Sequence, residues 1–157
     1  MMWTPLEFLA GGWQGTGGGE PGMGDYKRSY EFILNNKFLF VRNMSTYPPQ
    51  EQNPQGEIHE DWGIFSYDKN REKFVYRQFH KEGFVNQYVL EGHSPDFKEF
   101  SFISESIENI PSGWRARESY QVLSPEELIE TFELAAPGKD FEQYTQCHLK
   151  KINLNTL

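Results

Sequence analysis

The sequence lacks most features that would place a protein in a membrane or in an oxidising compartment. Cys147 is the one cysteine among 157 residues, so no disulfide can form within the chain, and this favours a reducing compartment. No apolar run approaches the roughly 18 residues that a transmembrane helix requires. The start, Met1-Met2-Trp3-Thr4, lacks the basic and then apolar layout of a signal peptide. We therefore expect a cytoplasmic protein.

Basic residues are also scarce and scattered. The chain has 15 Lys and Arg against 23 Asp and Glu, which gives a formal net charge of −8. Its longest basic runs are the pairs Lys27-Arg28 and Lys150-Lys151. Nucleic acids and anionic membranes both require a clustered basic face. We therefore expect neither as a partner.

Motifs of enzyme chemistry are absent as well. The sequence contains no G-x-S-x-G elbow, P-loop, C-x-x-C or H-E-x-x-H motif. The only base adjacent to Cys147 is His148, which would point to the opposite face of a strand. Cys147 is therefore expected to be a small core residue, and no catalytic residue is predicted.

Glycines and aromatic residues carry most of the information. Aromatic residues make up 16% of the chain, and they favour strands and line pockets. The most informative stretch is Gly11–Gly19, in which Trp13 is set among glycines. Gly15 and Gly17 share a strand face with Trp13, so the backbone can bend sharply while the indole fills one end of a barrel.

A short helix signal precedes this stretch. Thr4-Pro5-Leu6-Glu7 has the form of a capping box with proline at the first helical position, and Gly11-Gly12 is a natural stop. These residues predict one or two helical turns. Such a helix can cover one end of a barrel.

The rest of the chain alternates apolar and polar residues with the period of two that is typical of strands. After the strand that begins at Trp13, the segments with this pattern are 26–34, 38–44, 58–64, 74–80, 84–90, 97–107, 114–122, 128–134 and about 141–152. Residues 124–127 mimic a helix start, but the alternation from Leu128 onwards favours a strand. Ten short strands with one small helix predict an all-β protein, a closed antiparallel up-and-down barrel that forms a single domain over residues 1–157. A barrel of ten strands leaves an internal cavity.

Several polar residues lie on the same face of these strands as most of the apolar residues, the face that we expect to point into the barrel. They are Arg28, Arg42, Glu60, Gln78, His80, Asn86, Glu118 and Glu130. Buried charges are costly unless they are paired or hydrated, so we expect a water-containing cavity that accepts a ligand, with Tyr30 and Trp62 in its aromatic lining. The alternative for each residue is an outward position, because a shift of one residue in register reverses the face.

Histidines offer two further candidates. His80 and Asn86 flank a short turn and, with Gln78, could present donors and acceptors to a ligand at the barrel rim, or they could be structural. His59 and Asp61 lie two apart on one strand face, a spacing open to a metal ion. Two ligands do not make a site, and no third stands at a recognisable spacing, so no metal site is predicted.

Several segments resemble a known family. Gly11-x-Trp13-x-Gly15-x-Gly17 has the form of the GxWxGxG signature of nitrobindin-like haem-binding β-barrels, which are calycins related to fatty-acid-binding proteins and lipocalins. Residues 58–63 look like another segment of that family, and residues 77–88 and 107–118 resemble a functionally uncharacterised bacterial branch. The resemblance implies that His148 is the iron ligand of haem b, that the haem acts on nitric oxide or peroxynitrite, and that the protein is a homodimer. It also implies that Lys150 or Lys151 stacks on Trp13.

These observations leave two main hypotheses for function. The first is a barrel that binds a small apolar or amphipathic ligand with a polar or anionic head near Arg42 and His80. The second is a haem barrel with His148 as iron ligand. The alternative for His148 is an outward position, because its neighbours Cys147 and Leu149 could take the inward face of the last strand. A barrel that serves as a structural or interaction module is a third possibility.

Overall fold

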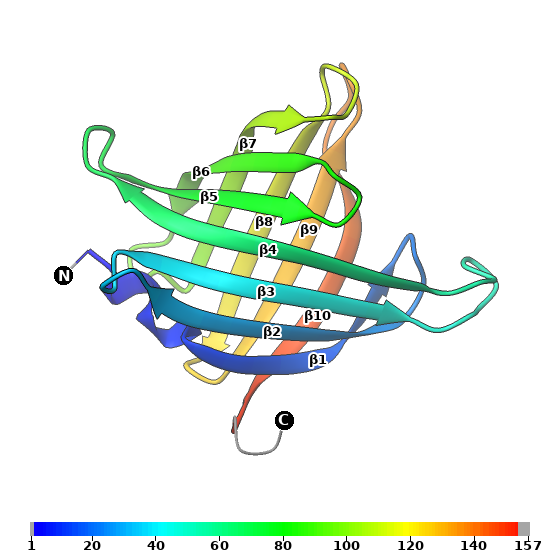
Figure 1. Cartoon of the computed structure of the whole chain (residues 1–157), viewed down its shortest axis with the longest axis horizontal. Helices are drawn as coiled ribbons and strands as arrows, with labels where there is room; N and C mark the ends of the chain where they lie inside the picture. Colours follow the sequence, from blue (N-terminus) through cyan, green and yellow to red (C-terminus); the bar gives the residue numbers. More distant parts are fainter. Residues whose placement is uncertain (1, 154–157) are drawn as a thin grey trace.

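Ten antiparallel strands form a closed barrel in the computed structural model, which describes residues 2–153. Each strand pairs with the next along the chain, and β1 pairs with β10 to close the barrel (Figure 1). The elements are the 3-10 helix η1 (Thr4–Leu9) and the strands β1 (Gly11–Gly19), β2 (Gly24–Ile33), β3 (Phe38–Tyr47), β4 (Glu57–Asp68), β5 (Lys73–His80), β6 (Val85–His93), β7 (Glu99–Glu108), β8 (Arg115–Ser124), β9 (Glu127–Ala135) and β10 (Glu142–Ile152). The predicted fold is confirmed, including a strand rather than a helix after Glu127. No helix of the described residues is long and apolar enough to cross a membrane.

The predicted N-terminal helix is present but begins differently from the expected capping box. Trp3 is the N-cap, and its carbonyl oxygen accepts hydrogen bonds from the backbone N–H groups of Leu6 and Glu7. No side chain caps the helix. These bonds to Trp3 make a tight 3-10 turn, in which the hydroxyl of Thr4 is not needed as a cap.

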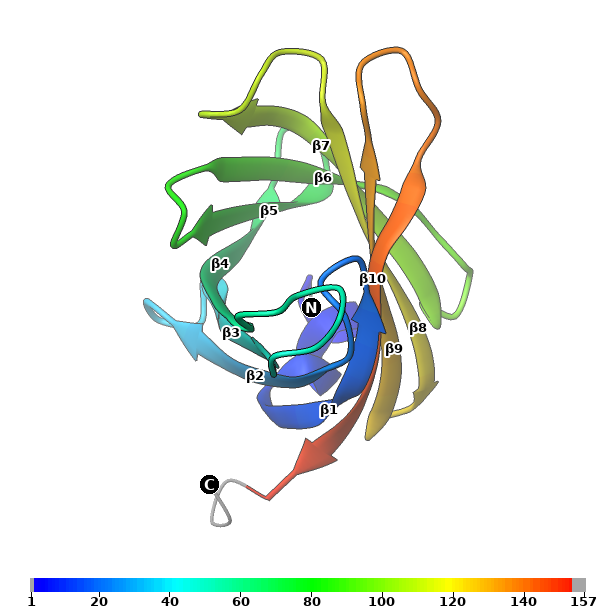
Figure 2. The ribbon, with the colours of Figure 1, turned by 90° about the vertical axis from the view of Figure 1, so that its right-hand side faces the viewer.

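The end of the barrel beside η1 is filled by Trp13, as the sequence predicted. The indole is fully buried, and its Nε1 donates a hydrogen bond of 2.8 Å to the carbonyl oxygen of Leu9. The ammonium group of Lys151 lies 5.4 Å from the centre of the indole ring and donates a hydrogen bond to the carbonyl oxygen of Phe8. The expected cation–π contact from the last strand is therefore formed by Lys151. Figure 2 shows η1 within the ring of strands.

Strand β1 lies unusually close to β10 along this seam. A Cβ atom built on Gly15 would lie 1.7 Å from the carbonyl oxygen of His148, and one on Gly17 would lie 2.1 Å from that of Gln146. Both distances are far below van der Waals contact. Glycine at these alternate positions therefore allows the first and last strands to pair.

Aromatic side chains pack the half of the interior nearest η1. Phe65 stacks on Tyr76 with ring centres 4.0 Å apart, and Phe102 lies edge-on to Phe65 at 5.5 Å. On the inward face of β4, Phe65 belongs to this core, whereas Asp61, four residues earlier, lines a cavity. The core thus occupies one part of the barrel and leaves the other open for polar residues.

Candidate functional site

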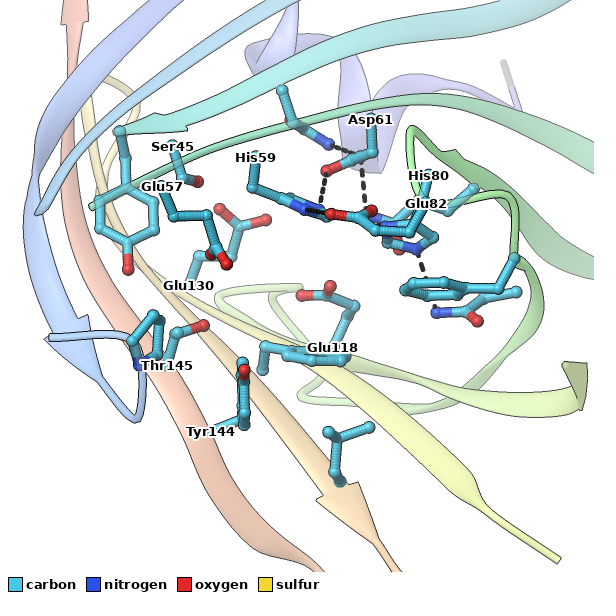
Figure 3. A pocket seen from close by; sticks show the side chains of 18 of the residues that line it. Ser45, Glu57, His59, Asp61, His80, Glu82, Glu118, Glu130, Tyr144 and Thr145 are labelled. Atoms are coloured by element: carbon cyan, nitrogen blue, oxygen red, sulfur yellow. Dashed lines mark hydrogen bonds and ion pairs between the residues drawn. The ribbon is translucent and has the colours of Figure 1, made fainter. Parts of the chain in front are cut away.

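A cavity of about 530 Å³ occupies the part of the barrel that the aromatic core leaves free. Its polar lining residues include Arg28, Asn43, Ser45, Glu57, His59, Asp61, Gln78, His80, Glu82, Asn86, Glu118, Glu130 and Thr145. Its apolar lining residues include Phe84, Ile107, Ile110, Trp114, Phe132 and Leu134. Figure 3 shows His59, Asp61, His80 and Glu82 gathered on one side of this pocket.

Six of the ten residues that the sequence placed on the cavity face lie in this wall. They are Arg28, Gln78, His80, Asn86, Glu118 and Glu130. Gln78 lies directly opposite Asn86 across the β5–β6 pair, and Asn86 Nδ2 lies 3.4 Å from His80 Nε2. The structure therefore brings together the three rim residues that the sequence singled out. Their role in binding a ligand stays a prediction.

The other four predicted residues do not line the cavity. Tyr30 is buried in the aromatic core, 6.4 Å from the ring of Phe65. Arg42, Glu60 and Trp62 are exposed on the outer face of β3 and β4. The predicted inward position of these three residues was wrong, and with it the assignment of Arg42 to a ligand head group.

The error on β3 and β4 has a physical cause. Phe40, Arg42 and Trp62 form a cluster on the outer surface, in which the guanidinium of Arg42 lies 5.4 Å from the Phe40 ring and 5.3 Å from the Trp62 ring. Next to the cavity the inward face carries small and polar residues such as Asn43 and Asp61, whereas Phe65 on the same face packs in the core. In this part of the two strands the more apolar face is therefore the outer one, the reverse of the usual pattern.

His148 also lies outside the barrel. Its side chain is 48% exposed, and its Nε2 lies 3.2 Å from Glu127 Oε1. The neighbouring Cys147 and Leu149 are buried and take the inward face of β10. An imidazole on the outer wall cannot reach the iron of a haem inside the barrel, so the residues present do not fit a haem held by His148.

Three residues that could bind a metal ion meet at the cavity wall. His59 and Asp61 of β4 and His80 of β5 each offer a ligand atom, and these atoms lie within 4.8 Å of one another. His59 Nε2 is 3.4 Å from Asp61 Oδ2 and 3.2 Å from His80 Nδ1. The third ligand that the sequence analysis did not find is thus His80.

Hydrogen bonds and burial set the protonation of this cluster. Burial alone would raise the pKa of Asp61, but hydrogen bonds from His59 and Gln78 and the nearby charge of Arg28 outweigh it, so the pKa is lowered. Burial lowers the pKa of His59, but its hydrogen bonds to Asp61 and Glu82 raise it above the usual value. Burial dominates at His80 and lowers its pKa to about 4. At neutral pH, Asp61 is therefore ionised and His80 is neutral.

A second group of titratable side chains lies on β2, β8, β9 and β10. Arg28 Nε donates a hydrogen bond of 3.1 Å to Glu130 Oε2, and both side chains are largely buried. Burial, and then the charge of Glu130, raises the pKa of Glu118 well above the usual value. Burial also raises the pKa of the Cys147 thiol, which lies 3.7 Å from Glu130 Oε2. Cys147 is a buried thiol, as expected, and is poorly suited to act as a nucleophile.

The buried carboxyl of Glu118 is expected to make the stability of the protein depend on pH. Its pKa in the folded protein lies above the value of about 4.3 for an unperturbed glutamate. Above that pH the unfolded chain loses the proton while the folded protein keeps it, so stability is lost as pH rises towards the folded pKa. Glu118→Gln is expected to become progressively more stable than the wild type between about pH 4.5 and about pH 7.5, as measured by urea unfolding.

The control for this prediction is Glu51→Gln, which changes an exposed glutamate in the loop between β3 and β4. Its stability difference from the wild type is expected to be the same across this pH range. A Glu118→Gln difference that is equally flat would show that Glu118 ionises normally in the folded protein.

The fold and the cavity define the class of protein: a closed ten-stranded up-and-down β-barrel with an internal pocket of ligand size. The chain is similar in structure to Rv2717c from M. tuberculosis, with a TM-score of 0.74 over 97% of this chain and 98% of that chain, at 16% sequence identity. This likeness shows the barrel fold. The sequence matches no protein-family model and no curated protein. The resemblance to the nitrobindin-like family therefore stays one of sequence motifs.

Proposed function

We propose that this barrel binds a small, largely apolar molecule that carries a neutral or cationic polar group. The observation that supports this most directly is the cavity itself, whose volume of about 530 Å³ lies within the roughly 300–1,000 Å³ of small-molecule pockets. Its apolar residues, such as Ile107, Phe132 and Leu134, suit a hydrocarbon or ring system. Its polar residues suit a group that forms hydrogen bonds.

The charges of the residues that line the cavity indicate which charge the polar group of the ligand carries. Among the described lining residues, the carboxyl groups of Glu57, Asp61, Glu82 and Glu130 face one guanidinium, that of Arg28, and the protonated carboxyl of Glu118 adds no charge. Arg28 is already bound to Glu130. A ligand carboxylate or phosphate would therefore enter a region of like charge with no free basic partner, which costs both desolvation and repulsion. A hydroxyl, amide or amine is favoured over an anionic head.

The same charges weigh against a haem in this cavity. Haem carries carboxylate side chains that need basic or hydrogen-bonding partners, and its iron needs an axial ligand. Arg28 is occupied by Glu130, and His148 lies on the outer face. The binding of a smaller, non-anionic ligand is thus the function that the geometry supports best.

A displacement assay tests this proposal. Nile red, a neutral fluorophore, is expected to bind the wild type and to be displaced by dodecylamine and dodecanol at concentrations at least about tenfold lower than by dodecanoate, a difference of about 1.4 kcal/mol. Thr145→Trp should block binding because Thr145 lines the cavity. The matched control is Gln146→Trp, which places the same side chain on the outer face of the same strand and should leave binding unchanged.

Three outcomes would contradict the proposal. Equal loss of Nile red binding in the two tryptophan variants would show that the dye does not enter the cavity. Displacement by dodecanoate at the lowest concentration would reverse the sign of charge that we infer. A Soret shift on addition of hemin that is lost in His148→Ala would restore the haem hypothesis.

A further inference from the structure

The cluster of His59, Asp61 and His80 has the arrangement of a metal site. Its side chains come from two neighbouring strands, and Asp61 lies directly opposite His80 in the β4–β5 pair. All three line the cavity, and Figure 3 shows them on the same side of the pocket. The atoms that face one another are His59 Nε2, Asp61 Oδ2 and His80 Nδ1.

The distances between these atoms match those around a metal ion. Zinc binds nitrogen and oxygen ligands at about 2.0–2.2 Å, so two ligands at a tetrahedral angle are about 3.3–3.6 Å apart. The two separations made by His59 Nε2 are 3.2 Å to His80 Nδ1 and 3.4 Å to Asp61 Oδ2. All three ligand atoms lie within 4.8 Å of one another, so a metal ion could enter if the side chains of His80 and Asp61 move closer together.

Other hydrogen bonds hold the outer side of two of these ligands. His59 Nδ1 lies 2.9 Å from Glu82 Oε1, which orients the ring so that Nε2 faces the cluster. Asp61 Oδ1 accepts hydrogen bonds of 2.7 Å from Asn43 and from Gln78, which leaves Oδ2 directed at His59. Metal sites typically have such an outer set of partners, because it fixes the orientation of the ligands.

Asn86 supplies an independent observation next to His80. The side chain of Asn86 is almost fully buried, and its Oδ1 has no hydrogen-bond partner although the described residues surround it. Its Nδ2 lies 3.4 Å from His80 Nε2. Rotation of the amide by half a turn would place the oxygen there, where it would accept the Nε2–H of a histidine that binds a metal through Nδ1. In that orientation Asn86 would hold the outer side of His80, as Glu82 holds that of His59.

We propose that His59, Asp61 and His80 bind a divalent transition-metal ion of the kind that accepts imidazole nitrogen, such as Zn²⁺, with its remaining coordination positions open to the cavity. Two imidazoles and one carboxylate are a donor set that suits zinc or ferrous iron, whereas Mg²⁺ and Ca²⁺ prefer oxygen ligands. The carboxylate of Glu82, which lies 2.9 Å from His59 Nδ1, adds negative charge that favours a cation. The proposal does not depend on the ligand-binding function, although an open position on the metal would contact any molecule in the cavity.

Calorimetry with metal salts tests the site. Wild-type protein freed of metal by a chelator is expected to bind one Zn²⁺ per chain, and Co²⁺ at the same site is expected to give visible absorption bands that Zn²⁺ abolishes. His80→Ala should weaken Zn²⁺ binding by more than about 100-fold, because loss of a ligand costs more than loss of an outer partner. Glu82→Gln should weaken it by about 10- to 100-fold.

The matched control is His148→Ala. His148 also lies beside a carboxylate, that of Glu127, but on the outer face of the barrel. This variant should bind Zn²⁺ like the wild type, and a large excess of Mg²⁺ should not compete. Circular dichroism and a cooperative urea unfolding transition establish that His80→Ala is folded, and Asp61→Asn is the second variant if it is not.

Two results would overturn the proposal. One is wild-type protein that gives neither a heat of Zn²⁺ binding nor Co²⁺ bands while it still binds Nile red. The other is a folded His80→Ala or Asp61→Asn variant that binds Zn²⁺ as tightly as the wild type.

Discussion

Trp13→Ala is expected to lower the free energy of unfolding by about 3–5 kcal/mol, the cost of removing a large aromatic side chain from a packed core. The indole is fully buried, and it holds three parts of the chain together. It donates a hydrogen bond to Leu9 of η1, meets Phe8 edge-on with ring centres 6.2 Å apart, and lies under the ammonium group of Lys151. Urea unfolding followed by circular dichroism measures the loss.

Trp62→Ala is the control for this change. Trp62 is 49% exposed on the outer face, where it contacts Phe40 and Arg42. Its loss should cost about 1 kcal/mol or less, since contacts of this kind at exposed sites contribute about 0.5–1 kcal/mol. A cost below about 1 kcal/mol for Trp13→Ala would show that Trp13 does not fill the closed end of the barrel.

Gly15→Ala is expected to cost about 3 kcal/mol or more, the upper part of the range for forcing extra atoms into a packed region. The added methyl group would lie 1.7 Å from the backbone oxygen of His148, which cannot move without disturbing the pairing of β1 with β10. The strands would have to separate at the seam that closes the barrel. The same urea titration measures this effect. Earlier elution from a size-exclusion column is expected only if the barrel opens.

Gly92→Ala is a matched control within another strand. Gly92 lies in β6, and a Cβ atom built there has no atom within 4 Å. Alanine at this position should change stability by less than about 1 kcal/mol, and a small gain is expected from the loss of freedom in the unfolded chain. Equal costs for the two variants would show that the close approach of β1 to β10 does not limit the choice of residue.

The strands and the closed end could be predicted from the sequence because both depend on local patterns. Alternation with a period of two reports a strand whichever face is buried, and it holds even where a helix start intervenes before Leu128. Trp13 could be assigned to a barrel end because glycines on the same face leave room for the backbone to bend. Neither inference requires knowledge of which residues of two strands lie opposite each other.

The candidate site could be predicted only in part because it depends on that missing information. Where β3 and β4 line the cavity, the outer face is the more apolar one, so the usual rule of hydrophobic residues inside assigned Arg42 and Glu60 to the wrong side. His80 joins His59 and Asp61 across the β4–β5 hairpin, in which Asp68 lies opposite Lys73 and Asp61 opposite His80. Pairing the two strands outward from their turn would have supplied the third ligand.

The pairing of β1 with β10 has a consequence for how the chain reaches its native state. The contact joins the first strand to the last, so it is the pairing with the greatest separation in sequence, and it can form only after the last strand has left the ribosome. Until then β1 and the most recently made strand are both open edges that could pair with another chain. A β1 rich in glycine presents few side chains to such a partner, so the residues that permit the final close approach also make a poor template for aggregation while the barrel is open.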